Sequence, residues 1–156
     1  MNSSSKCRVW VAGLGNVLMS DDGVGAVAAR MLSEAPSADT VFSEVGTAIM
    51  FYSNLISDAE SILCLDAVTS GKKPGTVTVF TLDDIEASGE KWRSSHELTL
   101  LDAVDIFRQG KRPTIKIIGI EPERIEYGLE LSASVKNAIP ELLALAKKTI
   151  SEMMNC

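Results

Sequence analysis

The chain has 156 residues, of which 46% are apolar, so it can build one sizeable hydrophobic core within a single domain, residues 1–156. Its 15 Lys and Arg against 21 Asp and Glu give a net charge of −6, which argues against a nucleic-acid or anionic-membrane surface. The N-terminus lacks a signal-peptide pattern, no apolar run approaches ~18 residues, and the cysteines lack zinc-site spacing. We therefore expect a cytoplasmic, monomeric domain with no nucleic-acid or membrane partner.

A strand, a glycine-rich turn and a helix open the chain. The apolar run 8–14 predicts a strand, and apolar residues over 24–32 recur at helical spacing. The turn between them contains four glycines and two adjacent carboxylates, Asp21 and Asp22. Adjacent residues at a helix start point about 100° apart, so only one acid can face the strand ends. We assign Asp22 to a functional site and Asp21 to capping or solvent, so that Asp21→Asn should cost at most about 1 kcal/mol.

Strand and helix patterns then alternate to the C-terminus. Further strands are predicted at 40–45, 61–68, 76–81 and 114–120, and helices at 49–56, 94–107 and 134–153. The link before 76–81 is too short for a parallel crossover, so this strand should run antiparallel to 61–68 if both lie in one sheet. Residues 82–93 read as an irregular surface connection with a helical turn at 83–87, and Pro140 predicts either a kink or a later start of the last helix.

This order of elements predicts the fold class. It is an α/β protein, a three-layer α/β/α sandwich on a mixed five-stranded sheet with one antiparallel strand, of the phosphorylase/hydrolase-like kind. In such open sheets, ligands bind at the carboxyl ends of the strands. Polar residues that follow strands are therefore the first candidates for a functional site.

Three residues satisfy this condition or lie near it. Asp22 follows the first strand, Asp66 is the one charge in the apolar run 61–68, and His96 is the only histidine, in the first turn of the helix 94–107. Taken alone, such a histidine is more often a solvated surface residue, and Asp66 can be a turn residue. Together, two carboxylates and an imidazole kept neutral by the positive end of a helix would form an open, reactive metal site. Asp22, Asp66 and His96 are thus the candidate catalytic and metal-ligating residues.

A second reading is a non-catalytic module that binds a nucleotide or docks a metal-loaded partner. Gly13 and Gly15 follow a strand, and Glu44 ends the next strand, where a ribose-binding acid belongs in dinucleotide-binding folds. The glycine-rich fingerprint of dinucleotide-binding folds requires a third glycine, but Leu18 occupies that position. Glu44 is therefore more simply explained as a surface residue at the end of a strand.

The motifs as a set resemble the hydrogenase maturation endopeptidases, which trim the C-terminus of the large subunit of NiFe hydrogenases. The resemblance covers nearly the whole chain and is carried by these segments: Gly13-Leu14-Gly15-Asn16-Val17-Leu18-Met19-Ser20-Asp21-Asp22-Gly23-Val24-Gly25, Leu65-Asp66-Ala67-Val68, Gly71, Pro74-Gly75, Ser95-His96, Ile118-Gly119-Ile120-Glu121-Pro122, Ile125-Glu126, Gly128, Leu131-Ser132 and Ala138-Ile139-Pro140.

The resemblance implies a function and a site. The family's metal ligands fall on Asp22, Asp66 and His96, and the implied activity is removal of the C-terminal extension of a hydrogenase large-subunit precursor after nickel insertion. The implied metal is nickel, supplied by the precursor, which would polarise the scissile carbonyl or activate a water. With three protein ligands, the isolated site should bind divalent ions weakly, so zinc or cadmium in a crystal would be adventitious.

Overall fold

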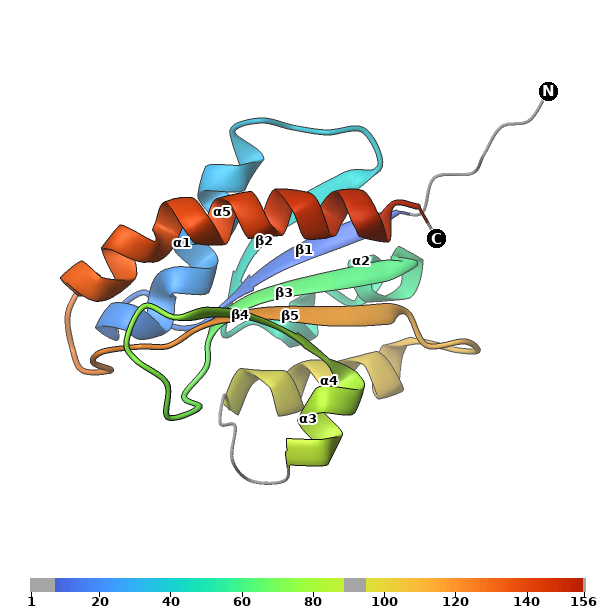
Figure 1. Cartoon of the computed structure of the whole chain (residues 1–156). Helices are drawn as coiled ribbons and strands as arrows, with labels where there is room; N and C mark the ends of the chain where they lie inside the picture. The colour runs from blue at the N-terminus through green and yellow to red at the C-terminus, as the bar shows by residue number, and fades with distance from the viewer. Residues whose placement is uncertain (1–7, 89–94, 156) are drawn as a thin grey trace.

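A five-stranded mixed sheet forms the centre of the molecule (Figure 1). The structure is a computed structural model that describes residues 8–88 and 95–155; the side chains of residues 86, 88 and 95–99 are outside this description. The strands lie in the order β2-β1-β3-β5-β4. Their bounds are Val9–Leu14 for β1, Thr40–Gly46 for β2, Ser61–Ala67 for β3, Val77–Thr81 for β4 and Thr114–Ile120 for β5. The predicted fold class is confirmed.

Strands β1, β2, β3 and β5 are parallel, and β4 runs antiparallel to β5. The direction predicted for β4 is therefore correct, although its partner is β5 and not β3. Every residue of β1 and β3 is buried, as expected for central strands covered on both faces. The carboxyl ends of the four parallel strands meet at one edge of the sheet, which we call the carboxyl edge.

Helices cover both faces of the sheet (Figure 1). Helices α1 and α5 pack on one face, and α2 and α4, with α3 at the margin, pack on the other. The helices span Val24–Ser33 for α1, Ser53–Asp58 for α2, Leu82–Ser88 for α3, Ser95–Phe107 for α4 and Ala133–Met153 for α5, with 3-10 turns at Ser20–Gly23 for η1 and Ile49–Phe51 for η2. No helix in the described ranges is long and apolar enough to cross a membrane.

Two local predictions are confirmed only in part. The helical turn predicted at 83–87 lies within the longer helix α3, which Thr81 and Asp84 begin by bonding each other's backbone N–H groups, at 2.8 and 3.2 Å, as in a capping box. The rest of the predicted connection, 89–93, lies outside the described residues. Helix α5 begins at Ala133 and includes Pro140, so the later helix start, one of the two alternatives predicted at Pro140, is wrong. Pro140 has no N–H to bond the carbonyl of Lys136, four residues earlier. Both residues are exposed, so water can hydrate that carbonyl. The predicted helix 94–107 corresponds to α4, and its predicted first residue, 94, lies outside the described part of the chain.

Candidate active site

The turn after β1 brings the start of α1 against the end of β3. Gly15 has φ +107°, and a Cβ built on it would lie 1.8 Å from the carbonyl oxygen of Asp22 and 3.4 Å from Oδ1 of Asp66. A Cβ on Gly25 would lie 2.0 Å from the carbonyl oxygen of Leu65. Since only glycine allows such close approach, the spacing of glycines in this turn places Asp22 and Asp66 around Gly15 at the carboxyl edge.

Asp22 lies in η1 and is half-buried. Its Oδ2 accepts a hydrogen bond from the backbone N–H of Asn16 at 2.9 Å, and the side-chain Oδ1 of Asn16 accepts one from the N–H of Leu18 at 2.9 Å. The turn therefore folds back on itself and fixes the Asp22 carboxylate. Asp22 is thus the more exposed of the two adjacent acids, and its assignment to a functional site stays a prediction.

Asp66 is the penultimate residue of β3 and is fully buried. It lies opposite Gly119 of β5, and its Oδ1 accepts a hydrogen bond from the N–H of Ala67 at 2.9 Å. A carboxylate buried at the end of a central strand is costly unless it is bonded, so its presence in an otherwise apolar strand points to a role at this edge.

The third candidate, His96, has its side chain outside the described part of the structure. In the helix that carries it, the C-terminal end lies beside α2, because the hydroxyl of Ser57 donates to the carbonyl of Phe107 at 3.3 Å. The first turn of this helix therefore faces the carboxyl edge (Figure 1). Among the described side chains, no cluster of three or more His, Cys, Asp or Glu is placed to hold a metal ion.

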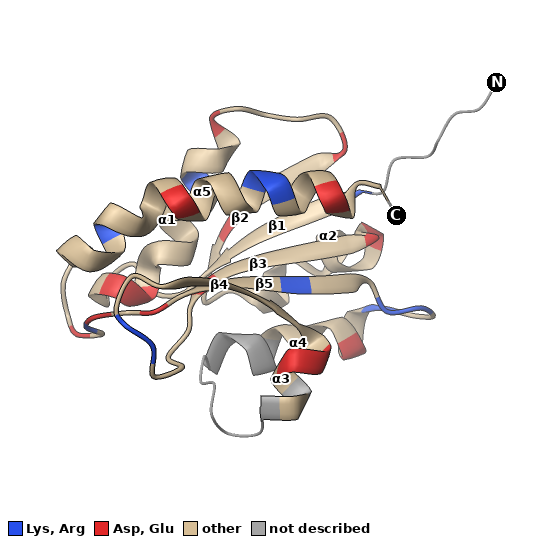
Figure 2. Cartoon of the chain, viewed as in Figure 1, with Lys and Arg blue, Asp and Glu red and all other residues tan. Residues whose placement is uncertain are grey.

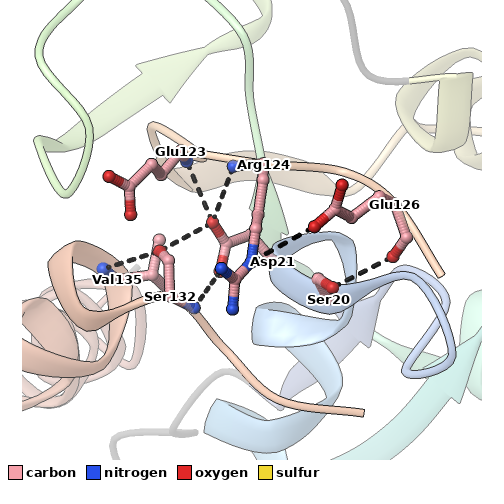
Figure 3. A network of polar contacts seen from close by, with 7 residues as sticks. All are labelled: Ser20, Asp21, Glu123, Arg124, Glu126, Ser132 and Val135. Atoms are coloured by element: carbon pink, nitrogen blue, oxygen red, sulfur yellow. Dashed lines mark hydrogen bonds and ion pairs between the residues drawn. The ribbon is translucent and has the colours of Figure 1, made fainter. Parts of the chain in front are cut away.

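Asp21 has a different role from the one predicted, because it neither caps a helix nor faces solvent. It is fully buried and accepts four hydrogen bonds from the segment that follows β5 (Figure 3). The donors are the N–H groups of Glu123 at 2.9 Å, Arg124 at 3.1 Å and Ser132 at 2.7 Å, and the Ser132 hydroxyl at 2.8 Å. Asp21 therefore ties η1 to residues 123–132.

The hydrogen bonds also control the protonation of Asp21. Burial alone would raise the pKa of Asp21, but the backbone N–H groups of Ser132, Arg124 and Glu123 and the Ser132 hydroxyl outweigh it and hold that pKa below its ordinary value of 3.8. The side chain is thus a carboxylate at neutral pH, as four donors require.

A second anchoring carboxylate, Glu121, was missed by the sequence analysis. It is buried directly after β5, and its oxygens accept hydrogen bonds from the N–H and hydroxyl of Ser70, the shortest at 2.7 Å, and from the N–H of Gly71 at 3.2 Å. It therefore holds the loop that follows β3 and Asp66. The sequence contains a signal for this role, because Glu121 directly follows an apolar strand, just as Asp66 lies at the end of another apolar strand.

A groove of about 390 Å³ adjoins the turn after β1. It is lined by residues of that turn, the end of β2 and α1: Gly15, Asn16, Val17, Leu18, Ala26, Arg30, Glu44, Gly46 and Thr47. Glu44 is exposed and paired with Arg30 at 2.8 Å, which confirms its assignment as a surface residue at the end of a strand.

Known proteins share both the sequence and the fold. The family model for the hydrogenase maturation protease HycI matches residues 27–149. Hydrogenase expression/formation protein HupD of Rhodobacter capsulatus is 31% identical over 149 residues, which cover 92% of this chain and 71% of that protein.

Solved structures agree. The hydrogenase maturating endopeptidase HybD from Escherichia coli is 25% identical with a TM-score of 0.82, covering 93% of both chains. The NiFe hydrogenase maturation protease HybD from Thermococcus kodakarensis is 33% identical with a TM-score of 0.76, covering 92% of this chain and 99% of that one. The resemblance found in the sequence motifs is thereby confirmed: the chain belongs to the hydrogenase maturation protease family and is an endopeptidase.

Proposed function

We propose that this endopeptidase removes the C-terminal extension of a NiFe-hydrogenase large-subunit precursor after nickel insertion, and that Asp22, Asp66 and His96 bind the nickel carried by the precursor. The proposal is carried by the position of Asp22 and Asp66, which both lie next to Gly15 at the carboxyl edge, in a chain that belongs to the hydrogenase maturation protease family. Two carboxylates and an imidazole suit a divalent ion and leave coordination positions for ligands from the substrate.

The protein groups have separate tasks in this proposal. The half-exposed Asp22 carboxylate, fixed by Asn16, and the buried Asp66 carboxylate, fixed at the end of β3, approach the substrate's nickel from two elements. Bound nickel supplies a Lewis acid that polarises the scissile carbonyl or activates a water. Both routes require the endopeptidase to hold the scissile peptide bond of the precursor beside the nickel ion. Neither route requires a serine or cysteine nucleophile.

The alternative, a non-catalytic nucleotide-binding or docking module, has less support. Its ribose-binding candidate, Glu44, is already paired with Arg30, and the position of the third glycine is occupied by Leu18, which is exposed. The relatives named above are maturation proteases or proteins of hydrogenase formation.

The substitution Asp66→Asn tests the site. The amide keeps the size of the side chain and can still accept the Ala67 N–H, so the melting temperature should change by only a few degrees, but the charge that a divalent ion needs is lost. We expect the rate of C-terminal shortening of nickel-loaded precursor, followed by intact mass, to fall at least about 100-fold.

A matched control is Asp58→Asn, which alters an exposed aspartate at the end of α2. This variant should process the precursor at the wild-type rate. If Asp66→Asn did so as well, Asp66 would be a structural residue and the proposed site would be wrong.

A further inference from the structure

Four large apolar side chains are exposed beside the turn that carries Asp22. Leu18, Ile125, Tyr127 and Leu129 have exposed fractions of 55%, 48%, 90% and 79%, and we call them the apolar loop patch. Single exposed apolar residues are ordinary, but a group of them rimmed by polar residues is typical of an interaction site.

The members of the patch come from segments over 100 residues apart that are joined through Gly128. The Gly128 N–H donates to the carbonyl of Leu18 at 3.0 Å, and the N–H of Ser20 donates to the carbonyl of Gly128 at 2.8 Å. Since Tyr127 and Leu129 flank Gly128, they lie against the turn that contains Leu18. The two segments that carry the patch therefore lie side by side.

The exposure of these side chains is fixed by the backbone. Asp21 holds the N–H groups of Glu123, Arg124 and Ser132, and the Ser20 hydroxyl donates to the carbonyl of Glu126 at 3.0 Å (Figure 3). The loop is thus anchored at both ends and in the middle. A surface presented in this way loses little conformational entropy when a partner binds.

Charge around the patch indicates what covers it. Glu123, Glu126 and Glu130 are exposed in the same segment against a single base, Arg124, and Figure 2 shows acidic residues along the chain that leaves β5. A second copy placed by a two-fold axis would bring like charges together, and an anionic membrane would be repelled. An apolar protein surface with a basic rim is the complementary partner.

We propose that the apolar loop patch docks the folded body of the hydrogenase large-subunit precursor, through an apolar surface of the precursor with a basic rim. This inference rests on the proposed function, because a substrate whose nickel reaches Asp22 must also cover Leu18, four residues earlier in the same turn. Leu18 also lines the groove after β1, so the patch and the groove form a continuous surface.

The test is the double substitution Tyr127→Ala/Leu129→Ala, assayed on nickel-loaded precursor. Both side chains are exposed, so the melting temperature should not change. We expect KM to rise at least about ten-fold with kcat within two-fold, because the lost contacts bind the substrate without touching the reacting bond. The control is Ile106→Ala, a 61% exposed apolar residue near the C-terminal end of α4, which should leave both constants unchanged.

An unchanged KM in the double variant would overturn the docking proposal while leaving the proposed function intact. If the wild-type protein failed to shorten the precursor, the proposed function would fail. The role of the patch would then be decided by comparing the affinity of the precursor for the wild-type protein with its affinity for the double variant. Weaker binding by the double variant would support docking, and equal binding would refute it. Loss of a homodimer with unchanged KM would assign the patch to a second copy instead.

Discussion

Asp21 and Asp22 are adjacent in η1 but act on different parts of the molecule. Asp21 is fully buried and bonded to the segment after β5, whereas Asp22 is half-buried and bonded to Asn16 in its own turn. Of the two acids, Asp22 is the more exposed. The capping or solvent role predicted for Asp21 was wrong, and the functional role of Asp22 stays a prediction.

At the scale of single residues, Asp21→Asn should destabilise the fold by about 2 kcal/mol, because a buried N–H donor would face the amide NH₂ group. This is twice the limit expected from capping alone. Urea unfolding measures the difference. A loss below about 0.5 kcal/mol would show that the contacts of Asp21 with residues 123–132 do not stabilise the protein.

The same substitution should change the acid sensitivity of the fold. Because the folded-state pKa of Asp21 lies below that of the unfolded chain, its carboxylate stabilises the fold above about pH 4, and this contribution is lost as the pH falls through the folded-state pKa. The gap in unfolding free energy between wild type and Asp21→Asn should therefore narrow below about pH 4. A gap that is constant down to pH 2 would contradict this assignment.

At the scale of elements, the turn between β1 and α1 depends on the absence of a side chain at residue 15. Gly15→Ala combines a positive φ with a Cβ 1.8 Å from the carbonyl oxygen of Asp22, so η1 must move. We expect the free energy of unfolding to fall by roughly 3 kcal/mol. Precursor processing should also be lost at temperatures where the variant is still folded.

The control for this prediction is Gly110→Ala. Gly110 also has a positive φ, +90°, but a Cβ there would meet no atom within 4 Å. Only the backbone strain remains, so the free energy of unfolding should fall by about 1–2 kcal/mol and precursor processing should persist. Equal effects of the two substitutions on stability and processing would show that the close approach to Asp22 is unimportant.

The elements also show which features a sequence can reveal. Apolar runs predicted all five strands, and the short link before β4 predicted its direction, because both depend on local pattern and length. Helix α3 was underestimated although Thr81 and Asp84 form a readable capping pair. The contact of Asp21 with Ser132 spans 111 residues, and no local pattern encodes it. The same holds for the choice of β5 as the partner of β4.

At the scale of the whole molecule, the parallel strands bring the candidate site, the groove and the apolar loop patch to one edge. Asp22 follows β1, Asp66 lies near the end of β3, and Tyr127 lies in the segment after β5. Motifs in the sequence predicted a site at this edge, whereas the patch follows from the tertiary contacts of Gly128. In the proposed function, the substrate is a folded precursor, so the endopeptidase needs both a reactive centre and a surface that recognises the body of the substrate.

In the proposed function, the nickel of the precursor directs cleavage. The most direct measurement compares two samples of one large-subunit precursor, nickel-loaded and metal-free, each incubated with this chain and analysed by intact mass. Only the nickel-loaded precursor should lose its C-terminal extension. Equal shortening of the metal-free precursor would contradict the role proposed for nickel and for Asp22, Asp66 and His96.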